Sequence, residues 1–322
     1  MKPIQWRKEA AGTYSLDMEQ LRPLLEFKAR IDWFQNIDLS KHTITWLSAA
    51  LKTICNHQTL RFTYLHHLGS VFRGRVLTEA EAKVMTASDL WYPPKHRITG
   101  LGRVNRRGQQ IFYCASSALA VLFELDPSPG SLLAILRSDV EPKDSPLNCV
   151  QLGIDRELLN KVEVPQQIID TIGKWQGDHD TTLIVNGIPI CDISESLILQ
   201  AFFHKLFAQR VPDDNRDLYK YTIAVADFWF ANKDLAGIAY PTICHRFQQA
   251  STMVGHNAAI RTSAADAYLK PAFVGLYRCS EVKEKGYSME LVSSSAEIDR
   301  EGKIRWSSKM VDMFGNRNSG AV

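Results

Sequence analysis

The order of apolar and polar positions predicts a chain of short strands and helices that do not alternate strictly. Near the N-terminus, apolar residues recur at helical intervals over residues 16–34 and again over residues 44–55. From Gly69 onward, short apolar runs are broken by glycine and proline, which is typical of strands joined by turns. Mixed elements without regular strand–helix–strand units favour an α+β fold.

The segments after Gly69 differ in period, so most can be assigned to one type of element. Strands are expected at residues 70–76, 109–115, 131–140, 148–154, 234–243 and 272–282. Helices are expected at residues 116–125, 192–210 and 222–231. The sequence AEIDREGKIRW, residues 296–306, is expected to form a hairpin.

Composition narrows the class of protein without indicating a function. Of the 322 residues, 45% are hydrophobic and 23% are charged, which excludes a wholly disordered chain. The net charge of +3 is too balanced to indicate nucleic acid or an anionic membrane as a partner. No apolar run has the length of a signal peptide or of a membrane-spanning helix. We therefore expect a cytoplasmic protein without membrane contact.

Cysteine and glycine spacings exclude several kinds of site. The six cysteines stand singly and form no CxxC or CxxH pair, so neither structural zinc nor a disulfide framework is expected. We expect reduced, mostly buried thiols and no bound metal. The glycines do not have the spacing of a Rossmann fingerprint or a P-loop, and HExxH, GxSxG and kinase signatures are missing.

The stretch from VFRGRV to ALAVLFEL holds the polar side chains that the surrounding pattern does not explain. Arg73 lies in the middle of an expected strand, where burial of its charge is costly without an anionic partner. Arg103 and Asn105 lie in a glycine-flanked turn, Tyr113 ends the next strand, and Glu124 lies in an apolar helix. A buried carboxylate facing arginines suits a site for an anionic ligand. A structural ion pair between Arg73 and Glu124 satisfies the same pattern.

These residues also occur in the order of a known family pattern. The pattern joins an arginine-bearing strand, a Pro-Pro pair, a G-R-x-N turn, a Y-x-A-S strand end and a helix that carries a glutamate. Here these elements are Phe72-Arg73-Gly74-Arg75, Pro93-Pro94, Gly102-Arg103-Val104-Asn105 with Gly108, Tyr113-Cys114-Ala115-Ser116, and Glu124. The stretch therefore resembles the RES domain family.

A later family element, G-x-x-Y-P-S followed by a glycine-asparagine strand, is matched with two departures. The matching residues are Gly237, Tyr240, Pro241 and Thr242, then Gly255 and Asn257. Thr242 stands where serine is expected, and it keeps a hydroxyl that can donate and accept. The usual Thr-Ala pair before the glutamate is Ala120-Val121 here.

The resemblance covers residues 65–280 and implies an ADP-ribosyltransferase-like mixed β core with flanking helices in this RES-like catalytic domain. Residues 1–64 are then a helical N-terminal extension. Residues 281–322 are then a C-terminal hairpin and flexible tail, packed on the same domain.

The resemblance also implies that NAD is the substrate and that the nicotinamide–ribose bond is cleaved. The activity is that of an NAD glycohydrolase or phosphorylase, acting as a toxin, with transfer of ADP-ribose to a protein as the alternative. An ionised carboxylate stabilises the oxocarbenium-like transition state of this cleavage. The resemblance assigns catalysis to Glu124, Arg73 and Thr242. It assigns binding of NAD to Arg73, Arg103, Asn105, Tyr113 and Ser116, with helix capping as the alternative for Ser116.

Partners and two rival functions follow from the same residues. A toxin implies a protein antitoxin or immunity partner, and helices within residues 15–57 are candidates for assembly into a homo-oligomer. One rival is a nucleic-acid-binding module built on Lys95, His96, Arg97, Arg103, Arg106 and Arg107, although Arg106 and Arg107 are expected to be solvated turn residues. The other rival is a scaffold that keeps the fold but lacks activity.

Overall fold

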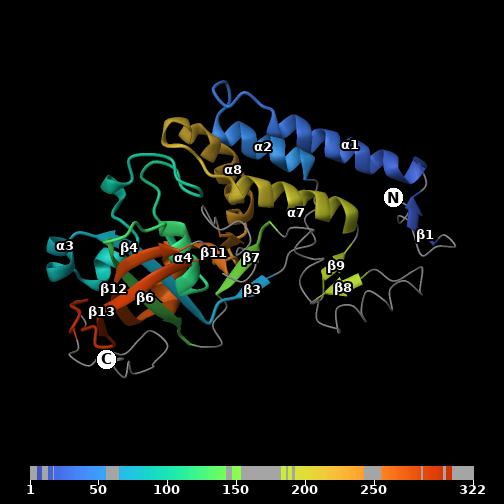
Figure 1. Ribbon diagram of the computed structural model, residues 1–322. Helices are drawn as coiled ribbons and strands as arrows, with labels where there is room; N and C mark the ends of the chain where they lie inside the picture. The colour runs from blue at the N-terminus through green and yellow to red at the C-terminus, as the bar shows by residue number, and fades with distance from the viewer. Residues whose placement is uncertain are drawn as a thin grey trace.

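The computed structural model describes residues 6–8, 14–16, 18–55, 65–142, 147–153, 183–185, 188–190, 193–242, 255–283, 286–299 and 302–306 (Figure 1). The expected flexible tail, NRNSGAV at residues 316–322, lies outside these ranges, as do Cys191 and Cys244. The other four cysteines are buried, as expected, and the described residues contain no disulfide. No described helix is long and apolar enough to cross a membrane.

Nine strands of the described residues form one mixed sheet in the order β13-β12-β6-β4-β5-β11-β10-β7-β3. Its neighbours pair antiparallel except β7 and β10, which are parallel. The prediction of an α+β fold is confirmed, and each of the six expected strands overlaps an observed one. The strands are β3 (Leu65–His67), β4 (Ser70–Leu77), β5 (Ile111–Ala115), β6 (Leu132–Val140), β7 (Asn148–Gln151), β10 (Gly237–Pro241), β11 (His256–Arg261), β12 (Leu269–Lys283) and β13 (Gly286–Ser295). Two small hairpins pair β1 (Trp6–Lys8) with β2 (Tyr14–Leu16) and β8 (Leu183–Val185) with β9 (Ile188–Ile190).

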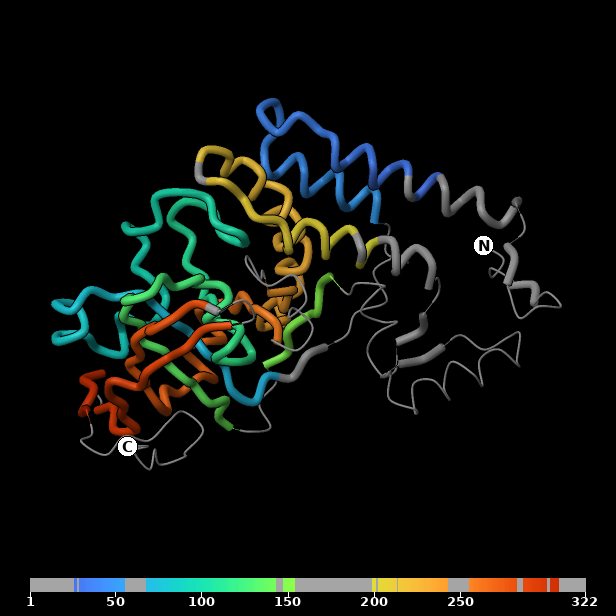
Figure 2. The backbone as a smooth tube through the Cα atoms, viewed as in Figure 1, coloured from blue at the N-terminus to red at the C-terminus, as the bar shows by residue number. Residues whose placement is uncertain are grey.

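Four helices form a layer beside the sheet, and Figure 1 shows them together at the top of the molecule. They are α1 (Met18–Gln35), α2 (Ile44–Ile54), α7 (Ile193–Ala208) and α8 (Tyr219–Phe230). In Figure 2 the blue N-terminal helices run alongside the yellow α8, and α2 contacts it directly. Phe34 and Leu47 of the N-terminal helices share one apolar core with Phe207 of α7, Val225 of α8 and Ala259 of the sheet. The N-terminal helices are thus tied to the sheet through α7 and α8.

Helix α4 (Ala118–Leu125) packs on the sheet and carries Glu124, the glutamate expected from the sequence pattern. Its first turn is capped by Ser117, whose Oγ accepts a hydrogen bond of 3.0 Å from Ala120 N. The helix lies so close to β4 that a Cβ atom on Gly74 would collide with Val121 Cγ1. The absence of a side chain at Gly74 therefore lets α4 lie close to β4, next to Arg73.

The C-terminal region differs from the expectation. Strand β12 runs without interruption through residue 280 and pairs with β13, which was not among the expected strands. Tyr287, Met289 and Leu291 alternate with polar positions in β13 and pack near Phe123 of α4. In the expected hairpin of residues 296–306, a bridge between Ile298 and Ile304 is described. The remaining short helices are α3 (Glu79–Val84), α10 (Thr262–Tyr268), η2 (Ala87–Leu90), η3 (Lys95–Arg97) and η4 (Asp213–Leu218).

Candidate functional site

A cavity of about 300 Å³, called here the first cavity, opens between β4, β5, β11, α4 and the first residue of α8. Its volume lies at the lower end of the range for small-molecule sites, about 300–1,000 Å³. Four of the expected site residues line it: Arg73, Arg103, Tyr113 and Glu124. Asn105, Ser116 and Thr242 are not among its lining residues.

Arg73 brings a positive charge to the first cavity. Its Nη1 donates a hydrogen bond of 2.5 Å to the carbonyl oxygen of Tyr113, and its guanidinium lies 5.7 Å from the centre of the Phe112 ring. The described residues offer it no acidic partner, and Arg73 and Glu124 do not form the ion pair that the sequence left open. Burial lowers the pKa of the Arg73 guanidinium. An anionic ligand would therefore supply the counter-ion that the described residues do not.

The turn that carries Arg103 and Asn105 is held by Tyr113. The Tyr113 hydroxyl accepts a hydrogen bond of 2.8 Å from Val104 N and donates one of 2.8 Å to Asn105 Oδ1. Asn105 is buried and fixes the turn from within, since Gly102 N also donates to its carbonyl oxygen at 3.0 Å. Burial raises the pKa of the Tyr113 hydroxyl. Tyr113 thus positions the turn and at the same time lines the cavity.

Arg103 is the second cation in the wall, and part of it is committed to the protein. Its Nη1 donates to the carbonyl oxygens of Phe207 at 2.7 Å and Gln209 at 3.2 Å, at the end of α7. The guanidinium also lies 5.7 Å from the centre of the Tyr219 ring. These contacts join the turn, α7 and the start of α8 around one buried charge.

Glu124 was expected to be buried, and this expectation is wrong: its side chain is exposed at the mouth of the first cavity. In α4 the side chains of Ala120, Val121 and Phe123 face the core, and Glu124, the residue after Phe123, therefore faces the solvent. The carboxylate is held from the sheet, because Asn257 Nδ2 donates a hydrogen bond of 2.9 Å to Glu124 Oε2.

Ser116 and Thr242 both contact the short segment before Asn257. Ser116 Oγ accepts a hydrogen bond of 2.9 Å from His256 N, and Thr242 Oγ1 donates one of 3.0 Å to the carbonyl oxygen of Gly255. The cap of α4 is Ser117, so the alternative role of Ser116 as a helix cap is wrong. Both hydroxyls hold the backbone that leads to Asn257.

Three features of the site were missed or misjudged. Tyr219 and Tyr240 line the first cavity; Tyr219 gives no local signal, and Tyr240 had no assigned role. Burial first, and then the nearby Glu124 carboxylate, raise the pKa of the Tyr240 hydroxyl. Arg106 was expected to be solvated, but both of its terminal nitrogens bind the carboxylate of Asp227, with 2.7 Å between Nη1 and Oδ1. The partner lies on α8, far along the chain, so no local pattern indicated the pair.

Comparison of the chain with protein-family models, curated proteins and solved structures gave no match. Among the described residues, no group of three His, Cys, Asp or Glu side chains is placed to hold a metal ion. The geometry of the first cavity and the sequence pattern that it contains are therefore the observations that bear on the chemistry of the site.

Proposed function

We propose that the chain degrades NAD by cleaving the bond between nicotinamide and ribose, and that its core is a RES-like form of the ADP-ribosyltransferase fold. The observation that carries the proposal is that Arg73 and Glu124 line one cavity without pairing with each other. The unpaired cation suits the pyrophosphate of a dinucleotide, and the carboxylate at the mouth suits its ribose.

The exposed position of Glu124 fits the chemistry of hydrolysis. The bond between ribose C1′ and the nicotinamide nitrogen breaks, and its electron pair goes to the ring nitrogen, so the leaving group needs no proton. Positive charge develops on the ribose, and the Glu124 carboxylate stabilises it. Water adds to C1′ and releases a proton to the solvent. At the mouth of the cavity, water has access to the reacting carbon.

The aromatic walls and the second arginine support binding of the rest of the substrate. Tyr113 and Tyr219 offer aromatic faces for nicotinamide or ribose. Arg103 keeps guanidinium nitrogens other than Nη1 for a phosphate oxygen. The roles of Ser116 and Thr242 are revised to positioning, because both act on the segment before Asn257.

Mono-ADP-ribosylation of a protein is the second candidate, and the same exposed carboxylate favours it. A protein side chain can reach C1′ at an open mouth as readily as water can. Under either activity, the proposal includes a cytoplasmic toxin, a protein antitoxin that covers the first cavity, and assembly through the N-terminal helices.

The nucleic-acid-binding rival loses support from two of its six basic residues. Arg103 is buried with its Nη1 on carbonyl oxygens, and Arg106 is paired with Asp227. The Arg103 guanidinium is therefore too buried to reach phosphates along a nucleic acid backbone, and the charge of Arg106 is already neutralised.

The test is release of nicotinamide from NAD by the purified chain, with and without phosphate, followed by chromatography. The Glu124→Gln variant is expected to lose activity by at least about a hundredfold. Glu290→Gln, an exposed glutamate on β13, is the matched control and should keep full activity. Dependence on phosphate separates phosphorolysis from hydrolysis. Equal release by Glu124→Gln and the unchanged chain would contradict the proposal, as would a chain that neither cleaves NAD nor binds it.

A further inference from the structure

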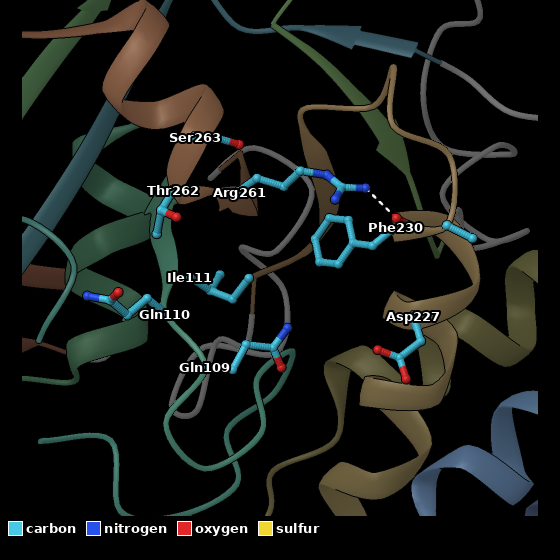
Figure 3. Close-up of a pocket in the computed structure, with 9 residues that line it drawn as sticks. Gln109, Gln110, Ile111, Asp227, Phe230, Arg261, Thr262 and Ser263 are labelled. Carbon is cyan, nitrogen blue, oxygen red and sulfur yellow. Dashed lines mark hydrogen bonds between the residues drawn. The ribbon is translucent and has the colours of Figure 1, made fainter. Parts of the chain in front are cut away.

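A second cavity of about 420 Å³ lies where β5 begins, β11 ends and α8 ends (Figure 3). Ile111 of β5 and Arg261 of β11 are register partners in its wall, and Asp227 and Phe230 come from α8. In the same pair of strands, Ala115 and Asn257 are partners in the wall of the first cavity. Four residues of extended strand separate the two positions, a distance of about 13 Å. The second cavity is thus distinct from the first.

Arg261 is fixed at the edge of the second cavity by the protein backbone. Its Nε donates to the carbonyl oxygen of Leu235 at 2.9 Å, and its Nη2 donates to those of Phe230 at 2.5 Å and Asn232 at 2.8 Å. The guanidinium lies 4.7 Å from the centre of the Phe230 ring, and Figure 3 shows the two side chains next to each other. These contacts use Nε and Nη2 and leave Nη1 for a ligand.

The charges that the described residues place around the second cavity sum to a positive value. The Asp227 carboxylate is neutralised by Arg106, and its Oδ2 also accepts a hydrogen bond of 3.3 Å from Ser48 Oγ. Arg261 binds only carbonyl oxygens, with no carboxylate among the partners that the described residues give it. Burial lowers the pKa of the Arg261 guanidinium, so its charge is partly desolvated, and none of the residues that the structure describes supplies a counter-ion.

Neutral hydrogen-bond donors complete the wall. Thr262 and Ser263 follow Arg261 directly and place two hydroxyl groups at the cavity. The amide of Gln109 accepts a hydrogen bond of 2.9 Å from Arg106 N through Oε1, which leaves its Nε2 as a donor. A fixed guanidinium, two hydroxyls and an amide N–H are the groups that bind an oxyanion.

We propose that the second cavity binds the oxyanion group of a small molecule, a phosphate or a carboxylate, with Arg261 as its charge partner. Thr262, Ser263 and Gln109 donate the neutral hydrogen bonds. The Phe230 ring, which packs along the guanidinium, forms the apolar side of the site. This site is separate from the cleavage of NAD and does not depend on it.

The test uses inorganic phosphate and acetate as probes at constant ionic strength, with chloride as the balancing anion. Line broadening of the ³¹P signal reports phosphate, and relaxation of the methyl protons reports acetate. Ala231→Glu puts a carboxylate into the cavity from an exposed position and is expected to weaken binding at least about tenfold. Ala267→Glu adds the same charge on the exposed side of α10 and should leave binding unchanged.

A further variant separates the two cavities. Arg73→Gln removes one of the two cations that line the first cavity. Saturable binding that persists in this variant and is lost in Ala231→Glu supports the proposal. The probe that binds more tightly identifies the ligand group as a phosphate or a carboxylate. Binding that Ala231→Glu leaves intact, binding that Arg73→Gln abolishes, or failure of both probes to bind the unchanged chain would overturn it.

Discussion

Asn257 Nδ2 donates a hydrogen bond of 2.9 Å to Glu124 Oε2, and this bond fixes the exposed carboxylate against the sheet. Helix α4 alone leaves that side chain free to rotate in solvent, because its other neighbours on the helix face the core. The position of the carboxylate is therefore set by two elements that lie far apart in the sequence.

Replacing Asn257 with alanine is expected to lower kcat for nicotinamide release about tenfold or more, with a smaller change in KM. A hydrogen bond to a charged group contributes about 1.5–3 kcal/mol, and its loss frees the carboxylate to leave the reacting carbon. Asn257→Asp should be worse, because it sets two carboxylates against each other. Steady-state kinetics with NAD measure both. A fall in the free energy of unfolding without a change in kcat would show that Asn257 has only a structural role.

Substitutions at Thr242 test whether threonine in place of the expected serine affects activity. Thr242→Ser keeps the hydroxyl that donates to the Gly255 carbonyl oxygen, and Thr242→Val removes it from a buried position. We expect Thr242→Val to lower the free energy of unfolding by about 1 kcal/mol and Thr242→Ser to keep the wild-type activity. Urea denaturation and nicotinamide release give the two values. Loss of activity in Thr242→Ser would argue against the positioning role.

The pair of Arg106 and Asp227 ties the turn of the first cavity to the helix that borders the second. Breaking it from either side should destabilise the chain by about 1 kcal/mol, because both side chains are partly exposed. The two variants should differ in phosphate binding at the second cavity. Arg106→Ala leaves the Asp227 carboxylate unneutralised and should weaken phosphate binding. Asp227→Asn removes that negative charge and should tighten phosphate binding. The ³¹P titration distinguishes these signs, and changes in the same direction would contradict the charge argument.

Asp38, in the connection between α1 and α2, gives a prediction at acid pH. Hydrogen bonds from the Ser40 hydroxyl, first, and from Lys41 lower its pKa from 3.8 to about 2. The folded state thus holds the proton less tightly than the unfolded state, so the stabilisation is present above pH 3.8 and is lost as the pH falls towards about 2. Ser40→Ala should raise this pKa in an NMR titration. Thr53→Ala, which removes a hydroxyl bonded within α2, should not.

The sequence predicted the elements well and the surroundings of individual side chains less well. Arg73 was placed correctly in a strand, and the apolar run around it made its charge conspicuous as a candidate for ligand binding. Glu124 was taken as buried because the residues on both sides of it are apolar, yet the period of the helix turns Phe123 inward and Glu124 outward. The leucine at position 119 is likewise 44% exposed, so apolar neighbours do not define a buried face in so short a helix.

Contacts between distant segments gave no local signal. Nothing in the polar sequence around Arg106 indicates Asp227, since the two are joined only when α8 packs against the turn. Strand β13 did carry a signal, the alternation of Tyr287, Met289 and Leu291 with polar residues, but the serines around it resemble a loop. Its pairing with β12 is a contact along two strands that no single stretch of sequence displays.

Helix α8 borders the first cavity with Tyr219, its first residue, and the second with Phe230, its last. Between these ends, the Tyr221 hydroxyl donates to the carbonyl oxygens of Gln35 and Ile37, each at 3.1 Å, at the end of α1. A chain shortened to begin at residue 65 would leave this face of α8 in water and remove the support of one wall of each cavity. The N-terminal helices and the sheet would therefore have to be inherited together. A sheet without these helices, or joined to the N-terminal helices of another protein, would need a new support for α8 before either cavity could bind a ligand.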